Sequence, residues 1–432
     1  MNNAEINSLA LFGGSKTIIE PFRLYNSIGK EEVAAGKAVI ESGVLSKYIG
    51  AWHPDFLGGP KVKEFEAACS EFFGAKHAVT VNSWTSGLVA AVGAIGIGPG
   101  DEVITTPWTM SASATAILHW NGIPVFADID RDTFNLDLLS VERNITEQTK
   151  AIISVDIFGM SADMDEIMAL AQKYKLKVIS DTAQGPGAKY KEKYAGTLAD
   201  IGGFSLNYHK HIHTGEGGVL VTDDDELAER LQLIRNHAEV VVEGKGVKDL
   251  TNMVGHNFRL GEIECAIGIE QLLKLPRLVE ERQALALALT AELSVLPYLQ
   301  TPVISEDRDH VFYVYPLILD VANLGVSRDR ICDALEAEGL AVMRRYQNIH
   351  LLPMYQQKIA FGTSGFPWNS EFCKRDVDYS KGICPVAEGL NDESFIGLGM
   401  CVYDLKLLHI KQIADAFKKV WCNLDSLRDL GA

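Results

Sequence analysis

Short apolar runs alternate with helix-like segments along much of the chain, beginning near residue 65. HAVTVN (77–82) precedes the Ala-rich SGLVAAVGAIG (86–96), and IPVFADID (123–130) and KAIISVDIFG (150–159) follow, with helical patterns between them. The apolar runs are continuous and do not alternate with polar residues, which is typical of parallel strands covered on both faces. The pattern predicts an α/β domain built on a mostly parallel sheet.

The length of the chain favours a second domain. At 432 residues it exceeds the size at which one core usually stops growing. A long helical stretch over 262–296, interrupted at Pro276, is interpreted as the connector between two domains. We predict a large domain over 1–285, which includes an N-terminal arm, and a smaller α+β domain over 286–432.

Three segments indicate the elements of the smaller domain. HVFYVYPLILD (310–320) is typical of a strand, and SRDRICDALEAEGL (327–340) is typical of a helix capped by Ser327. LKLLHIKQIADAFKKVW (405–421) has the apolar spacing of an amphipathic C-terminal helix.

Charge and composition disfavour several classes of protein. A formal net charge of −17 argues against nonspecific binding to nucleic acid, which needs a basic surface. No apolar run reaches the roughly 20 residues of a membrane span, and the N-terminus lacks the pattern of a signal peptide. The seven cysteines are scattered without a CxxC pair, which indicates a cytoplasmic protein with no zinc or disulfide framework.

Two nucleotide-binding signals fail on their context. LFGGSKT (11–17) ends like a P-loop, but it lacks the GxxxxGK[ST] spacing and no strand precedes it. No GxGxxG motif follows a predicted strand, so a Rossmann dehydrogenase is disfavoured.

A different anion signal lies in VTVNSWTSGL (79–88), where a strand passes into a helix through Ser83, Thr85 and Ser86. Free backbone N–H groups and the positive end of the helix dipole meet at such a point, and hydroxyls add further donors. The segment is therefore a candidate phosphate site. Ordinary N-capping by a hydroxyl side chain is the alternative.

Two further side chains follow predicted strands. Asp181 closes an apolar strand in KVISDTAQGPGA (177–188), at the edge of a parallel sheet where ligands usually bind. A helix cap or turn residue is the alternative, and Gln184 could present an amide to the same ligand. DIGGFSLN (200–207) predicts another strand, which ends at Ser205, and Lys210 follows shortly after it, roughly 30 residues beyond Asp181.

These features match the three handles of pyridoxal 5′-phosphate (PLP). A desolvated lysine can form a Schiff base with an aldehyde, and a carboxylate can hold a pyridine nitrogen protonated. A helix N-terminus can hold the phosphate. A zinc site built on His209, His211 and His213 is the alternative for NYHKHIHTGEGG (207–218), but no further Cys or His cluster lies nearby in the sequence.

The chain resembles the DegT/DnrJ/EryC1/StrS family of sugar aminotransferases over about residues 8–425. The resemblance rests on a set of segments in the same order and spacing: GGPKVKEFEAACSEFFGAKHAV, GIGPGDEVITTPWTMSASATAILHWNGIPVFADID, SDTAQGPGA, GGFSLNYHKHIHTGEGGVL, GHNFRLGEIECAIGIEQLLKL and a weaker CPVAEGL. It implies the aspartate-aminotransferase fold (PLP fold type I), with a large domain and a smaller α+β domain.

The resemblance also implies roles for three residues. Lys210 would be the PLP Schiff-base lysine and the base for the 1,3-proton shift. Asp181 would pair with the pyridinium nitrogen, and Gln184 would bond the 3′-oxygen.

Further positions would hold the cofactor phosphate. The turn at Trp84 and Thr85 would hold it together with Ser205. Asn257 would reach it from the neighbouring subunit, which implies a homodimer with shared active sites. Arg259 and His350 match weaker candidates for substrate contacts, and a structural salt bridge or a satisfied loop histidine is an equal alternative for them.

The sequence departs from the family pattern at three positions. Trp84 stands where the phosphate turn usually has glycine, so the backbone must manage without the freedom of glycine. Met110 stands where an aromatic residue usually stacks on the cofactor ring, and a thioether can also lie against a π-face. Asn207 replaces the usual histidine after the FSF-like strand.

The implied reaction moves an amino group from L-glutamate to a keto sugar, often nucleotide-linked, for surface polysaccharides or secondary metabolites. The first alternative is a sugar 3-dehydratase of the same family that uses pyridoxamine phosphate. Such relatives carry histidine at the anchor, whereas the offset from TGEGG puts Lys210 there. The second alternative is a PLP-binding regulatory protein without turnover.

Overall fold

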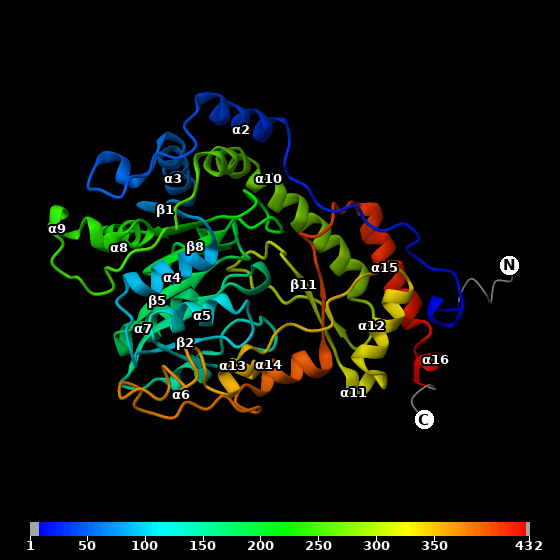
Figure 1. Ribbon diagram of the computed structural model, residues 1–432. Helices are drawn as coiled ribbons and strands as arrows, with labels where there is room; N and C mark the ends of the chain where they lie inside the picture. The colour runs from blue at the N-terminus through cyan, green and yellow to red at the C-terminus, as the bar shows by residue number, and fades with distance from the viewer. Residues whose placement is uncertain (1–7, 429–432) are drawn as a thin grey trace.

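The computed structural model describes residues 8–428 and is organised around a seven-stranded sheet (Figure 1). The strands lie in the order β1-β9-β8-β5-β4-β2-β3, and β9 alone runs antiparallel to its neighbours. The strands are His77–Val81 (β1), Glu102–Thr105 (β2), Ile123–Phe126 (β3), Thr149–Val155 (β4), Lys177–Asp181 (β5), Ile201–Ser205 (β8) and Gly218–Thr222 (β9). The prediction of a mostly parallel α/β sheet is confirmed.

Helices link these strands and cover both faces of the sheet (Figure 1). Successive residues of one strand enter different cores: Ile152 packs into one core and Ile153 into the core on the other face. Burial on both faces explains why the strands are continuously apolar in sequence. The covering helices are Pro60–Phe73 (α3), Trp84–Ala94 (α4), Ala112–His119 (α5), Leu138–Asn144 (α6), Met164–Tyr174 (α7) and Asp225–Arg235 (α8).

A single long helix, α10 (Glu262–Leu293), runs from the large sheet to the C-terminal region. Pro276 lies inside it, so the predicted interruption is wrong. Pro276 removes one backbone donor, but α10 packs against α2 (Lys30–Ser42), α3 and α15 (Leu407–Trp421) along its length. This burial outweighs the missing hydrogen bond and keeps the helix continuous.

A second, antiparallel sheet of three strands lies in the C-terminal region: β10 (Leu299–Gln300), β11 (Tyr315–Leu319) and β12 (Phe395–Leu398). It packs with α11 (Val321–Leu324), α12 (Arg328–Ala337), α15 and α16 (Leu424–Arg428) into a separate core. The predicted cap is confirmed, because the Ser327 hydroxyl accepts a hydrogen bond from the Arg330 N–H. The predicted C-terminal helix is also confirmed.

The predicted strand over 310–320 is correct only in its second half. Its first residues cross to the large domain instead, where the Val311 N–H donates to the Gly159 carbonyl and the Tyr313 N–H donates to the Phe158 carbonyl. These bonds replace pairing within the small sheet. They also bring Tyr313 toward the ends of the large-sheet strands.

The predicted boundary at residue 285 stays a prediction, and α10 passes through it without a break. Side chains from the predicted small domain, Tyr355, Trp368 and Tyr379 among them, pack into the core that holds Phe126 of β3. The N-terminal arm runs past the C-terminal region to α2 (Figure 1), and the buried carboxylate of Glu338 accepts hydrogen bonds from the Ala10 and Thr17 N–H groups.

Short elements complete the described chain: β6 (Lys189–Tyr190), β7 (Lys193–Tyr194), α9 (Val242–Lys245), α13 (Pro353–Gln356), α14 (Pro385–Gly389), single 3-10 turns at Ala10–Phe12, Pro54–Leu57, Ile157–Gly159, Ala238–Val240 and Ile349–Leu351, and a π-turn at Leu390–Ser394. Within residues 8–428, no helix combines the length and apolar character that crossing a bilayer requires.

Candidate active site

Asp181 is the last residue of β5, and its carboxylate is buried. Its Oδ1 accepts hydrogen bonds from the Trp84 indole N–H at 2.6 Å and from the Ala183 backbone N–H at 3.2 Å. Its Oδ2 accepts one from the Ser113 hydroxyl at 2.7 Å. Burial raises the pKa of Asp181, and these donors together with the Lys210 charge oppose the rise. A carboxylate has about four acceptor sites, so one remains for a further donor.

The indole of Trp84 lies in a slot between two glycines, and a third glycine lies against its backbone. A Cβ atom at Gly203 would lie 2.5 Å from the ring carbon Cζ3, and one at Gly87 would lie 2.9 Å from Cε3. At Gly218 an added Cβ would come within 3.0 Å of the Trp84 backbone. The glycines of β8 and α4 therefore make room for the ring that reaches Asp181, and the glycine of β9 makes room for the Trp84 backbone.

Lys210 follows β8 in a loop, and its side chain is only 8% exposed. Its Nζ lies 4.2 Å from the centre of the Tyr313 ring, a cation–π contact. Burial lowers the pKa of Lys210 to about 8, and the Asp181 charge opposes that change. No ion pair joins these two described residues, so their charges influence each other across a gap.

Burial of the Lys210 amine should make the stability of the folded protein depend measurably on pH. Because the Lys210 pKa is about 8 when folded and near 10.5 when unfolded, the unfolded chain holds more protons between these values. The contribution of Lys210 to the free energy of unfolding therefore rises with pH from about 8 to 10.5. Below pH 8, burial of the charged amine lowers the free energy of unfolding by about 3 kcal/mol. Lys210→Met, measured by thermal unfolding without added ligands, should raise Tm at pH 7 by about 2–4 °C.

That gain in Tm should shrink toward zero as the pH approaches 10.5. Lys189→Met is the matched control, because the Nζ of Lys189 also lies over a tyrosine, 5.3 Å from the Tyr194 ring centre, and Lys189 is only partly buried. A gain that is independent of pH, or equal in the two variants, would contradict a buried charge at Lys210.

The Gln184 amide is buried beside Asp181 and is held from two sides. Its Oε1 accepts a hydrogen bond from the Phe158 N–H at 2.9 Å, and its Nε2 donates to the Tyr346 hydroxyl at 3.0 Å. An amide nitrogen has two donors, so one N–H of Gln184 remains available to a ligand. Burial raises the pKa of Tyr346 to about 12, which keeps its hydroxyl protonated at neutral pH.

The candidate phosphate site lies at the start of α4. The Ser83 hydroxyl accepts a hydrogen bond from the Ser86 N–H, so the N-capping alternative is correct for Ser83 itself. The first N–H groups of the helix, at Trp84 and Thr85, lack acceptors within the helix. Thr85 is exposed, and the buried Ser205 at the end of β8 keeps its own O–H free to donate while it accepts from the Asn207 N–H.

Met110 and Asn257, which were predicted to touch the cofactor, are both exposed. Met110 is 64% exposed just before α5. The Asn257 backbone pairs with Asn236, while its side chain faces outward. Neither role is tested within one chain, and both stay predictions.

The two weaker candidates make structural contacts. The His350 imidazole is fully buried, with Nε2 2.9 Å from Glu388 Oε1. Arg259 Nε donates to the Asn236 side chain at 2.8 Å. The His350 contact is that of a satisfied histidine, whereas Arg259 bonds an uncharged amide and forms no salt bridge within residues 8–428, so its role stays a prediction.

The three histidines around Lys210 point to different partners. His211 is fully buried and its Nε2 lies 2.7 Å from the Val311 carbonyl, while His213 Nδ1 accepts from the Gly215 N–H. The His209 ring lies between Tyr208 and Tyr313, at centroid distances of 4.9 and 6.0 Å. In residues 8–428 no group of three or more histidine, cysteine or acidic side chains is placed to hold a metal ion.

Three site residues were not predicted from the sequence: Ser113, Tyr313 and Tyr346. Ser113 is in the first turn of α5, and its position after a predicted strand end was an available signal. The two tyrosines come from the C-terminal part of the chain and meet the site only through the tertiary fold. No local pattern marks them.

Known proteins match both the sequence and the overall fold. The family model of the DegT/DnrJ/EryC1/StrS aminotransferase family matches residues 49–393. The chain belongs to this family. The spore coat polysaccharide biosynthesis protein SpsC of Bacillus subtilis is 36% identical over 358 residues, covering 81% of this chain and 89% of SpsC.

Two further relatives of this aminotransferase act in sugar biosynthesis. The GDP-perosamine synthase of Caulobacter vibrioides is 36% identical over 302 residues, covering 69% of this chain and 79% of that protein. The solved structure of Helicobacter pylori PseC, an aminotransferase in pseudoaminic acid biosynthesis, has a TM-score of 0.75 at 29% identity, covering 94% of this chain and all of PseC. The predicted fold type I architecture and aminotransferase class are confirmed.

Proposed function

We propose that this aminotransferase uses PLP to move an amino group from L-glutamate to a nucleotide-linked keto sugar, for surface polysaccharide or secondary-metabolite biosynthesis. The buried amine of Lys210, near Asp181 but unpaired with it, is the observation that carries the proposal. Family membership and the sugar chemistry of GDP-perosamine synthase and PseC support the acceptor class.

The chemistry of the donor set fits PLP. Asp181 has one free acceptor site for a protonated ring nitrogen, and Gln184 has one free N–H for the phenolic oxygen. The start of α4 and the Ser205 hydroxyl supply donors for a phosphate. When bound, PLP supplies a carbonyl carbon that takes the amine and a ring that accepts electrons.

Lys210 would anchor the cofactor and carry the proton. With its pKa near 8, a sizeable fraction of the amine is neutral at physiological pH, and a neutral amine is both a nucleophile and a base. Once released, the Nζ of Lys210 would remain over the Tyr313 ring, where it can take a proton from the substrate and return it one position away.

Asp181 would orient the ring and keep its nitrogen protonated. Three donors fix the carboxylate and favour its charged form against burial. Tyr346 would hold Gln184 in place from the C-terminal region, so the donor to the phenolic oxygen does not depend on water.

The proposed enzyme is a cytoplasmic homodimer with shared active sites. Asn257, exposed near the start of α10, would reach the cofactor phosphate of the neighbouring subunit, and Met110 would lie against the cofactor ring. Thr85 is exposed at the start of α4, which leaves it free for the phosphate of the cofactor bound by its own subunit.

One assay separates this proposal from its rivals. The purified enzyme is mixed with L-glutamate and a panel of nucleotide-linked 3- and 4-keto sugars, and products are identified by mass spectrometry. We expect 2-oxoglutarate and an amino sugar in equal amounts. A 3-deoxy sugar would indicate the dehydratase, and PLP binding without any product would indicate the regulatory protein.

Removing the indole donor from Asp181 should slow catalysis selectively. Trp84→Phe keeps an aromatic ring in the glycine slot but removes the N–H that donates to Oδ1 at 2.6 Å. We expect kcat to fall about 10- to 100-fold with little change in KM for glutamate, because a hydrogen bond to a charged group contributes about 1.5–3 kcal/mol. Steady-state kinetics with glutamate and a keto sugar measure both constants.

Trp120→Phe is the matched control for that prediction. The Trp120 indole N–H also makes one hydrogen bond, to the Val89 carbonyl at 2.8 Å, outside the site. Equal losses of kcat in the two variants, or an unchanged kcat in Trp84→Phe, would contradict a specific role for the indole.

A further inference from the structure

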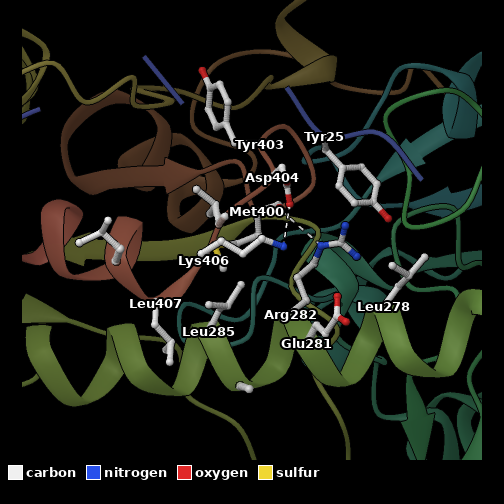
Figure 2. A pocket seen from close by; sticks show the side chains of 13 residues that line it. Tyr25, Leu278, Glu281, Arg282, Leu285, Met400, Tyr403, Asp404, Lys406 and Leu407 are labelled. Carbon is white, nitrogen blue, oxygen red and sulfur yellow. Dashed lines mark hydrogen bonds and ion pairs between the residues drawn. The ribbon is translucent and has the colours of Figure 1, made fainter. Parts of the chain in front are cut away.

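A groove runs along α10, on its C-terminal half (Figure 2). It has a volume of about 600 Å³ and lies between this helix and residues 400–408, which lead into α15. Most of its wall is apolar, including Leu278, Leu285 and Leu407. The size and lining are those of a site for a small molecule.

The wall of the groove contains a buried arginine that lacks a counter-ion. Arg282 is only 5% exposed, and its guanidinium carbon lies 4.8 Å from the centre of the Tyr25 ring. Its Nε donates to the Met400 carbonyl at 3.3 Å, while its buried Nη1 has no hydrogen-bond partner. No carboxylate within residues 8–428 forms an ion pair with it. Figure 2 shows the guanidinium pointing from α10 toward Tyr25.

Other buried arginines of the described chain are neutralised. Each of three pairs with a carboxylate: Arg230 with Asp249, Arg235 with Glu66, and Arg328 with Asp329. A buried charge without a partner is costly, because the interior replaces little of its lost hydration. An anion is therefore the ligand that Arg282 lacks.

The titratable groups beside the guanidinium do not supply this anion. Burial raises the pKa of the Cys401 thiol and of the Tyr25 hydroxyl, so both stay protonated near neutral pH. The Tyr25 hydroxyl also donates to the backbone carbonyl of His211, the residue after Lys210. The groove thus borders the lysine loop, but neither Lys210 nor Asp181 lines it.

The charged side chains at the rim are already paired. Glu281 accepts from Arg277 at 2.6 Å, and Asp404 forms an ion pair with Lys406 at 3.0 Å. These pairs cancel, so the groove retains the single positive charge of Arg282. One charge favours a monoanion, and the planar guanidinium matches a carboxylate with two parallel hydrogen bonds.

We propose that this groove binds a small organic monocarboxylate with an apolar body, whose carboxylate pairs with Arg282. The apolar part of the ligand lies along Leu278, Leu285 and Leu407. Both halves of the ligand then meet a matching surface, and the Arg282 charge is neutralised.

Octanoate is the probe, titrated by calorimetry into the purified full-length protein. We expect one site per chain with a Kd of about 1 mM or lower. Octanamide, which has the same body without the charge, should bind at least about tenfold more weakly. Absence of octanoate binding, or equal affinity for octanamide, would overturn the proposal.

Variants locate the site. Arg282→Gln should weaken octanoate binding at least about tenfold, because it removes the charge and keeps a polar side chain. Arg143→Gln is the matched control: this arginine of α6 has a side chain 68% exposed and does not line the groove, and the variant should bind octanoate as the parent does.

A second variant keeps Arg282 in place. Leu407 is 66% exposed, so Leu407→Asp leaves the core intact and adds a negative charge at the groove. It should weaken octanoate binding and spare octanamide. Unchanged octanoate binding in both Leu407→Asp and Arg282→Gln would place the ligand elsewhere. If the parent protein binds no octanoate and the Arg282→Gln substitution dissociates its dimer, the groove would instead hold a carboxylate of a second copy. That outcome would overturn the proposal.

Discussion

Replacing Lys210 with alanine is expected to lower kcat at least about thousandfold and to remove the absorbance of the bound cofactor at the edge of the visible range. General acid–base catalysis alone contributes about 10²–10⁴-fold, and Lys210→Ala would also remove the proposed covalent anchor. The amine is 8% exposed and lies over the Tyr313 ring, so water cannot readily take its place. Coupled detection of 2-oxoglutarate and an absorbance spectrum measure the two effects.

Lys189→Ala controls for the loss of a lysine over a tyrosine, and it should keep both activity and absorbance. Methylamine added to Lys210→Ala should restore part of the rate, because a small amine can enter the space of the deleted side chain. An active Lys210→Ala variant with an unchanged spectrum would refute the assignment of Lys210.

Asp181→Asn is expected to lower kcat/KM about 10²–10³-fold, the range found when a preorganised electrostatic partner is removed. The amide is nearly the same size as the carboxylate but carries no charge to hold a ring nitrogen protonated. It also turns a donor toward the Trp84 N–H or the Ser113 hydroxyl, each of which now donates to Asp181. Steady-state kinetics and fluorescence of bound PLP would separate slower chemistry from weaker binding.

Asp156→Asn is the matched control for Asp181→Asn. Asp156 is the neighbouring buried carboxylate, with a pKa raised by burial to about 6, and it accepts from Thr182 and from the Ala162 N–H. Because its ionised form is disfavoured when folded, its contribution to stability falls as pH rises between about 4 and 6. This contribution concerns stability and not catalysis, so Asp156→Asn should change kcat/KM less than about fivefold. Equal losses in the two variants would argue against a specific role for Asp181.

Periodicity alone predicted the large sheet, because residues such as Ile152 and Ile153 must both be apolar when each faces a different core. The ends of β5 and β8 were also predictable, which located Asp181 and Ser205 at the same edge. The continuity of α10 through Pro276 was not predictable. It depends on burial against three other helices, which no local pattern records.

The candidate site divides in the same way. Lys210, Asp181 and Gln184 follow strands or stand in fixed motifs, so their chemistry was available from order and spacing. Trp84 was expected to contribute only its backbone to the site. Its indole instead donates to Asp181, because neighbouring glycines leave space for the ring. The direction in which the indole points depends on which neighbouring residues lack a side chain, and this is a property of tertiary packing.

The sequence by itself therefore determined the fold class, the family and the three residues with the strongest chemistry, because these depend on periodicity and on motif spacing. The tertiary structure alone decided which groups surround them: Ser113 and Trp84 on Asp181, Tyr313 over Lys210, and Tyr346 on Gln184. It also decided that Arg282 is buried without a counter-ion. Such pairings join segments far apart in the chain, and only the closing of the fold brings their charges and donors within reach.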